Sequence, residues 1–137
     1  MSAERLFIDT VCIVGLLNQD DQHHARAKSL LPRLESAAEV WVTEAIFIEV
    51  GSIFARANRQ AAAAFIEACF KAENFRVRSV DAVLFRKSLD LYGSRSDKDW
   101  SLTDCISFKV MEEQELRLAA TGDQHFRQAG YQALMLD

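Results

Sequence analysis

Four carboxylates stand at points where this chain changes from one kind of segment to another. They are, in chain order, Asp9, Glu49, Asp104 and Asp123. Each lies beside apolar residues and not within a charged, solvated run. If they converge, they repel one another, because a like-charged pair ~4 Å apart costs about 4 kcal/mol at an effective dielectric near 20. A divalent cation compensates for such repulsion, so the pattern predicts a metal site and phosphate chemistry.

Three of these acids also have a purely structural interpretation. Asp9 follows the apolar run LFI and is a favoured residue for capping a helix that begins near Thr10. Asp104 completes a capping box with Ser101, which explains its presence by itself. Asp123 follows a glycine, where turn or N-cap aspartates are common. These interpretations are compatible with a ligand role at the end of a strand.

Glu49 is the sharper signal. It lies three residues after Ile46 and four before Ile53, which places it in the expected buried stripe of its helix. A buried charge needs a partner or a metal, and the structural alternative is an ion pair with Arg56. Glu44, at the expected start of the same helix, is the reserve candidate, although the helix dipole already explains it.

Oxygen ligands favour hard cations, so Mg²⁺ is the expected metal and Mn²⁺ its substitute. The expected chemistry is metal-assisted hydrolysis of a phosphodiester, with the carboxylates as ligands or water-orienting bases. Thr121 offers a nearby hydroxyl for a metal-bound water or a phosphate. His125, a lone histidine at a helix start, is interpreted as a surface or packing residue. The pair His23 and His24 lacks zinc-site spacing and is interpreted as a polar helix start.

Short apolar runs alternate with longer amphipathic stretches along the chain. Strands are expected at Arg5–Ile8, Val40–Thr43, Phe75–Val80, Leu116–Ala120 and Ala133–Leu136. Helices are expected at Thr10–Leu17, Gln22–Ser36 with an interruption at Pro32, Ala45–Ala57, Gln60–Lys71, Asp81–Tyr92, Leu102–Glu115 and His125–Ala129. This alternation predicts an α/β fold with a central, mostly parallel sheet and helices on both faces. Ligands of such sheets bind at the carboxyl ends of the strands, which is where Asp9 and Asp123 are expected.

Length, composition and charge limit the kinds of protein that this chain can be. A chain of 137 residues, half of them apolar, with five glycines and one proline, is expected to form one domain over residues 1–137. Its net charge of −4 argues neither for nor against nucleic acid, since a local basic strip is enough to steer RNA. Cys12, Cys69 and Cys105 are isolated in apolar segments and read as buried thiols of a cytoplasmic protein. No stretch is apolar and long enough to predict a membrane span.

Several blocks of the sequence together resemble the PIN-domain ribonucleases, and most closely the small VapC-like toxins of type II toxin–antitoxin systems. The blocks are FIDT, TEAIFIEV, DKDWSLTDCISF and TGDQHFRQAGYQALML, and the resemblance spans essentially the whole chain. It implies a three-layer α/β/α sandwich, a Mg²⁺- or Mn²⁺-dependent endoribonuclease, a homodimer and an inhibitory antitoxin partner. The acidic quartet of the family falls on Asp9, Glu49, Asp104 and Asp123, with Thr121 as a supporting hydroxyl.

Other functions remain open at this point. The main alternative is a non-catalytic binding module of the same fold, in which the acids are caps and ion pairs; a free-standing PIN nuclease without an antitoxin is another. An aspartyl-phosphate enzyme is not favoured, because Val11 stands where a phosphatase needs a second aspartate, and Gly122 and Asp123 stand where a receiver needs a lysine. If RNA is the substrate, the candidate phosphate-binding residues are Arg56, Arg59, Arg95, Lys98 and Arg127, and their contribution is expected to be salt-dependent.

Overall fold

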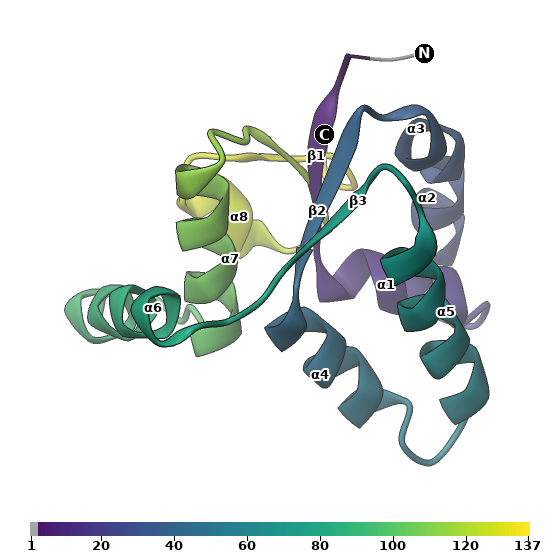
Figure 1. Cartoon of the computed structure of the whole chain (residues 1–137), viewed down its shortest axis with the longest axis horizontal. Coiled ribbons are helices and arrows are strands. Elements are labelled where there is room, and N and C mark those ends of the chain that lie inside the picture. The colour runs from purple at the N-terminus through teal and green to yellow at the C-terminus, as the bar shows by residue number, and fades with distance from the viewer. Residues whose placement is uncertain (1–2) are drawn as a thin grey trace.

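The computed structural model describes residues 3–137, in which helices and strands alternate along most of the chain (Figure 1). The strands are β1 (Arg5–Ile8), β2 (Glu39–Thr43), β3 (Phe75–Arg78), β4 (Leu118–Ala120) and β5 (Gln132–Ala133). The helices are α1 (Thr10–Leu17), α2 (His24–Ser29), α3 (Leu31–Ser36), α4 (Glu44–Ile53), α5 (Arg59–Lys71), α6 (Ala82–Ser94), α7 (Leu102–Glu113) and α8 (Gln124–Gln128).

The five strands form one sheet in the order β3-β2-β1-β4-β5, and every neighbouring pair is parallel. The chain therefore builds outward from β1 to β3 on one side, then returns to the other side of β1 for β4 and β5. Phe7 marks the centre of this arrangement, because it pairs with Trp41 of β2 and Ala119 of β4. The direction of winding reverses beside β1, and parallel sheets bind ligands at such reversals.

Helices cover both faces of the sheet. In Figure 1, α1, α2, α3 and α5 lie on one side and α6, α7 and α8 on the other, while α4 lies below the ends of the strands. The middle strands are buried over most of their length, as expected for parallel strands covered on both faces, and Phe7, Val40, Val42 and Ala119 are all at 0% exposure. The predicted α/β fold is confirmed, and the sheet is parallel throughout, whereas we predicted only that it would be mostly parallel.

Most differences from the predicted elements are at their ends. The interruption predicted at Pro32 in the helix over Gln22–Ser36 is confirmed: α2 ends at Ser29, and Pro32, which has no backbone N–H to continue it, lies in the first turn of α3. Helix α7 stops at Glu113, two residues early. Glu115 has a φ of 55°, and Leu116 N–H donates to the carbonyl of Met111 at 2.8 Å, so a Schellman motif closes the helix.

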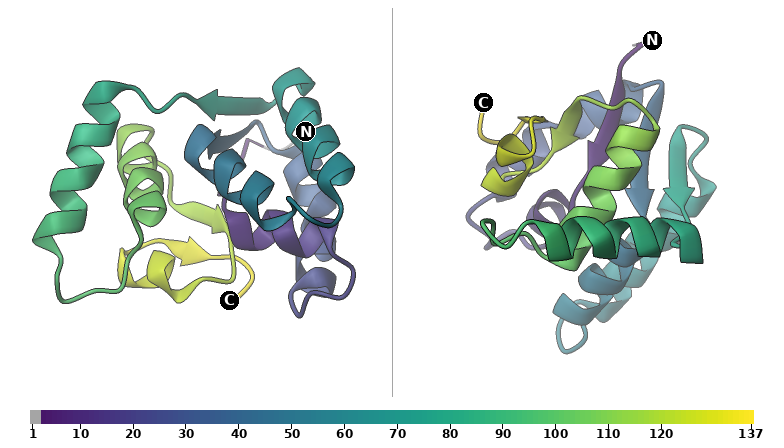
Figure 2. Two further views of the ribbon diagram at one scale, coloured as in Figure 1. Left: turned by 90° about the horizontal axis from the view of Figure 1, so that it is seen from below. Right: turned by 90° about the vertical axis from the view of Figure 1, so that its left-hand side faces the viewer.

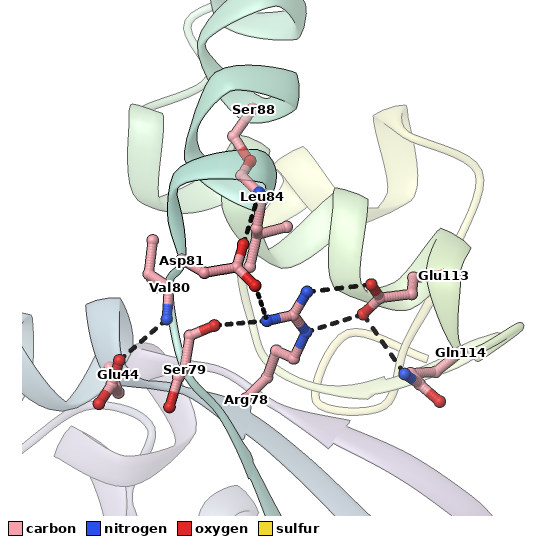
Figure 3. Close-up of polar contacts among 9 residues, drawn as sticks. All are labelled: Glu44, Arg78, Ser79, Val80, Asp81, Leu84, Ser88, Glu113 and Gln114. Carbon is pink, nitrogen blue, oxygen red and sulfur yellow. Dashed lines mark hydrogen bonds and ion pairs between the residues drawn. The ribbon is translucent and has the colours of Figure 1, made fainter.

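Arg78, the last residue of β3, ties three elements together (Figure 3). Its Nε and Nη2 donate to the two carboxylate oxygens of Glu113 on α7 at 3.0 and 3.1 Å. Its Nη1 donates to the Ser79 carbonyl at 2.6 Å and to Asp81, the N-cap of α6, at 3.3 Å. Glu44 of α4 accepts from Val80 N–H at 2.9 Å, so the segment between β3 and α6 is fixed from both sides.

Replacing Arg78 with methionine is expected to lower the free energy of unfolding by about 1–2 kcal/mol, because a bidentate, partly buried ion pair is lost. Arg76 provides the matched control. It lies on the same strand, is exposed, and donates only to the carbonyls of Glu73 and Phe75. Arg76→Met is therefore expected to cost under about 0.5 kcal/mol. Urea unfolding of both variants tests this, and equal losses would contradict a role for Arg78 in joining β3, α6 and α7.

The three cysteines are buried and unpaired, as predicted. Within residues 3–137, no helix combines the length and apolar character needed to cross a lipid bilayer.

Candidate functional site

The carboxyl-terminal edge of the sheet carries an acidic cleft of about 470 Å³. Viewed from below the sheet in Figure 2 (left), α1, α4, α7 and α8 lie around this edge. Each of these helices contributes residues to the lining, together with the segment between α1 and α2. The lining residues are Asp9, Thr10, Val11, Val14, Asp21, Gln22, His23, Glu49, Ile53, Ser101, Asp104, Asp123 and His125. All four acids predicted from the sequence are among them.

Asp9 follows β1 directly and is 3% exposed. Although it occupies the N-cap position of α1, its side chain makes no capping hydrogen bond. Its Oδ2 instead accepts a hydrogen bond from the hydroxyl of Thr121, at 2.8 Å. The same hydroxyl accepts from the backbone N–H of Asp123, at 3.0 Å. Thr121 is fully buried, so it holds two acids from neighbouring strand ends in one arrangement.

Asp104 lies in the first turn of α7 and is 7% exposed. The predicted capping box is present: Asp104 N–H donates to Ser101 Oγ at 2.9 Å, and Ser101 N–H donates to Asp104 Oδ2 at 3.0 Å. The same Oδ2 lies 2.8 Å from Nδ1 of His125. With its proton on Nδ1, the imidazole donates to this carboxylate, which leaves Oδ1 free of both partners.

Asp123 is the N-cap of α8, where its Oδ1 accepts from His125 N–H at 2.9 Å. This confirms the capping role weighed for it from the sequence. The cap folds His125 back over the start of α8, so that its Nδ1 also lies 3.4 Å from Asp123 Oδ1. One imidazole therefore contacts both Asp104 and Asp123.

Glu49 comes to the cleft from α4. Its helix buries Ile46, Phe47 and Val50, while Glu49 itself is half-buried at the border of that stripe. The prediction that Glu49 lies within the buried stripe is therefore wrong: its side chain is only partly buried, at the edge of the stripe. The ion pair with Arg56 is also absent, since none of the ion pairs found among residues 3–137 involves Glu49. Glu44, the reserve candidate, bonds to Val80 N–H and does not line the cleft.

Burial controls the charge state of the cluster. It raises the pKa of Asp9 to about 7; the hydrogen bond from Thr121 opposes this, and the negative charges of Asp104 and Asp123 reinforce it. Burial likewise raises the pKa of Asp104, against the hydrogen bonds from Ser101 N–H and His125. In the metal-free protein these carboxylates therefore resist ionisation, which is the condition that a bound cation relieves.

The donor set fits a divalent cation. One ligand atom from each of Asp104, Asp123 and His125 lies within 4.8 Å of the others, and Asp9 is joined to Asp123 through Thr121. Thr10 supplies a further observation: its Oγ1 is buried beside these acids, in the lining of the same cleft, with no hydrogen-bond partner. A hydrated cation would satisfy this hydroxyl. The carboxylate oxygens suit Mg²⁺ and Mn²⁺ alike.

One expectation about the surroundings of the site differs from the structure. His125, interpreted from the sequence as a surface or packing residue, contacts two of the acids; its position two residues after an N-cap aspartate is the signal that was available. None of the five basic candidates for phosphate contact is in the cleft lining found within residues 3–137, and their contact with RNA stays a prediction. Arg95, for example, pairs with Asp97 and stacks 4.8 Å from the centre of the Trp100 ring.

Comparison with models of known protein families matches residues 6–131 to the PIN domain. The chain belongs to the PIN-domain family. Members of this family are typically metal-dependent nucleases, and the acidic cluster of this PIN domain lies where such an active site is expected. No curated protein sequence matches the chain significantly.

The fold of this PIN domain is similar to that of solved proteins from bacterial toxin–antitoxin systems. The crystal structure of VapC20 from Mycobacterium tuberculosis, a toxin that cleaves the sarcin–ricin loop, is 25% identical with a TM-score of 0.82, over 92% of this chain and 95% of VapC20. VapBC2 from Rickettsia felis, bound to a promoter DNA fragment, is 8% identical with a TM-score of 0.64, over 94% and 96% of the two chains. FitAcB from Neisseria gonorrhoeae is 16% identical with a TM-score of 0.57, over 93% and 95%. The last two share the fold.

Proposed function

We propose that this PIN-domain protein is a Mg²⁺-dependent endoribonuclease, with Mn²⁺ as a substitute, that hydrolyses RNA phosphodiesters in the acidic cleft. The observation that carries the proposal is the convergence of Asp9, Asp104 and Asp123, from three remote segments, on one edge of the sheet, with Glu49 lining the same cleft. Burial and mutual repulsion disfavour the ionised cluster without a cation. Acids that served only as caps and ion pairs would not need this arrangement.

The proposed roles follow from the contacts. Asp9, Asp104 and Asp123 would hold the metal, and Glu49 would complete the quartet and orient a water molecule. Thr121 positions Asp9 and Asp123 through its hydroxyl, and His125 positions Asp104 through Nδ1. A bound Mg²⁺ would supply an activated water and neutralise charge developing on the phosphate.

We also propose that the protein is the toxin of a toxin–antitoxin pair and forms a homodimer. The similarity to VapC20 supports a toxin, and the VapC and FitB relatives occur with antitoxins. Exposed apolar side chains on the described surface, such as Ile48 and Phe70 of α4 and α5 and Phe85 of α6, are available to a second chain. The buried free thiols suit a reducing compartment, so we place its action in the cytoplasm. A free-standing nuclease without an antitoxin is the alternative.

The first test is cleavage of a single-stranded RNA pool of random sequence by the purified protein, with Mg²⁺ or Mn²⁺ and with EDTA. Cleavage is expected with either metal and is expected to stop in EDTA. Thermal unfolding measured in parallel should show that Mn²⁺ stabilises the protein, by about 2.7 kcal/mol when the metal is present at a hundred times its Kd. This second readout reports the site independently of any substrate.

Asp97→Asn is the matched control for removing a carboxylate. Asp97 is exposed, pairs with Arg95 and lies outside the cleft, so its loss should change neither the cleavage nor the metal response. Cleavage that persists in EDTA would contradict a metal-dependent enzyme. Absence of both cleavage and metal stabilisation would favour the non-catalytic binding module.

A further inference from the structure

The lining of the acidic cleft also includes three apolar side chains, Val11, Val14 and Ile53. Val11 and Val14 lie three residues apart on α1, so they share one face of the helix, and both are half-buried where they line the cleft. The neighbouring Cys12 and Ile13 are fully buried in the core. Helix α4 contributes Ile53 to the lining, and this side chain keeps 52% of its surface exposed. None of these apolar side chains has a role in binding a cation.

His23, from the segment between α1 and α2, also lines the cleft. Its backbone is fixed, because its N–H donates to Asp21 Oδ1 at 2.8 Å and its carbonyl accepts from Ala27 N–H at 2.8 Å. Its ring lies on Gly122, the residue before Asp123. A Cβ at Gly122 would meet the ring at 3.1 Å from Cε1 and 3.2 Å from Nδ1, closer than side chains normally approach. The absence of a side chain at this position is what allows the imidazole to lie here.

We propose that His23, together with Val11, Val14 and Ile53, forms a subsite for one unpaired nucleobase of the RNA, next to the phosphodiester that is cleaved. The proposal rests on the proposed ribonuclease function and specifies it further. A nucleobase has flat, weakly polar faces and no charge, so it matches an imidazole plane and three aliphatic side chains. The phosphate that must accompany it belongs with the cation at the acids.

The cleft has room for a single nucleotide. Its volume of about 470 Å³ is within the range of sites that hold one small ligand. Proteins that read RNA sequence usually take bases from single strands or loops and stack them on flat side chains. The structure therefore points to a substrate with an unpaired base at the cleaved bond, and to His23 as the residue that contacts it.

Abasic substitution in the substrate tests this subsite directly. The bond that wild type cleaves in the random pool is first mapped, and oligoribonucleotides around it are made with one abasic nucleotide at each position in turn. One position beside the cleaved bond is expected to lower kcat/KM roughly tenfold, mainly through KM, because a stacking contact is lost. In His23→Ala the penalty at that position should disappear, while the intact substrate should itself be cleaved roughly tenfold less efficiently.

Three further variants separate stacking from other roles of His23. His23→Phe keeps a flat ring and is expected to restore the penalty of the abasic position. Gly122→Ala should displace the ring, so on its own it should lower cleavage efficiency and remove the abasic penalty as His23→Ala does. Combined with His23→Ala in a double variant, it should cause no further loss. His24→Ala is the matched control, since the His24 ring bonds to the Gly15 carbonyl at 2.7 Å and does not line the cleft. His24→Ala should leave the effect of each abasic position on kcat/KM as it is in wild type.

The outcomes distinguish failure of the subsite from failure of the proposed function. If wild type cleaves RNA but every abasic position behaves alike, or if His23→Ala keeps the wild-type profile, the subsite is wrong and the nuclease stands. Val11, Val14 and Ile53 would then be assigned to contact with a side chain of a partner protein. If His23→Ala loses the stabilisation by Mn²⁺, His23 acts through the metal site and the proposal is overturned. If wild type shows no metal-dependent cleavage, the proposed function fails and the subsite with it.

Discussion

Replacing Asp9 with asparagine is expected to reduce metal-dependent cleavage at least about a hundredfold, while it makes the metal-free protein more stable above pH 7. Loss of cleavage follows because a residue that only supports a metal ligand already contributes 10–100-fold, and Asp9 is proposed as a ligand itself. The gain in stability follows because a buried carboxylate is removed from beside two others. Asparagine keeps the shape and an oxygen that accepts from Thr121.

The pH dependence of this gain has a definite sign. The pKa of Asp9 is about 7 in the folded metal-free protein, against an ordinary value of 3.8. Between these values the folded state holds a proton that the unfolded state has released, so stability falls as pH rises from about 4 to about 7 and is level above. A pKa difference of roughly three corresponds to about 4 kcal/mol at most. Asp9→Asn should remove this dependence.

Urea unfolding in EDTA at pH 5 and pH 8 measures the effect. Relative to wild type, Asp9→Asn should gain stability at pH 8 and gain much less at pH 5, where Asp9 is already protonated. Asp97→Asn serves again as control, because Asp97 is exposed and its pKa is held below the ordinary range by Arg95. An Asp9→Asn protein that is less stable than wild type at pH 8 would mean that the carboxylate is not under repulsion.

Much of the fold could be predicted because its signals are local. The run LFI before Asp9 and the run LRLAA before Thr121 mark strands by composition, and parallel strands bring their carboxyl ends to one edge. The positions of Asp9 and Asp123 in the cleft followed from this rule. Helix ends were less predictable: the left-handed conformation of Glu115, which ends α7, carries no glycine or asparagine to signal it.

The contacts inside the site were not predictable in the same way, because they join segments that are remote in sequence. The hydrogen bond from Thr121 to Asp9 spans 112 residues, and the contact of His125 with Asp104 spans 21. Whether Asp9 caps its own helix or bonds to Thr121 depends on the register between β1 and β4, which the sequence leaves open. The same holds for the ring of His23 on Gly122, which needs the α1–α2 connection to pass over the end of β4.

The second large effect is expected at an aromatic residue whose ring packs against the elements that carry the acids. Phe126 of α8 is fully buried, with its ring centre 5.0 Å from that of Phe108 on α7 and 6.2 Å from that of Phe7 on β1. Phe126 is the neighbour of His125, Phe7 lies two residues before Asp9, and Phe108 lies one turn after Asp104. The three elements that carry the proposed metal ligands are thus packed on one ring.

Phe126→Ala is therefore expected to lower the free energy of unfolding by about 3–5 kcal/mol, because a fully buried ring leaves a cavity that its neighbours fill only in part. Phe85→Ala is the matched control, since Phe85 on α6 is 42% exposed and its loss should cost less than about 1 kcal/mol. Urea unfolding measures both. The stabilisation of each variant by Mn²⁺, measured below the unfolding transition of the weaker one, separates stability from the geometry of the site.

A weaker response to Mn²⁺ in Phe126→Ala than in Phe85→Ala would mean that the aromatic packing sets the spacing of the acids. Metal binding needs its ligands held within a fraction of an ångström, and α8 is a helix of only five residues, of which Phe126 is the buried one. If Phe126→Ala loses much stability but keeps its response to Mn²⁺, the polar contacts alone set the spacing of the acids. The hydroxyl of Thr121 and the capping box of Ser101 would then be sufficient to keep Asp9, Asp104 and Asp123 in place.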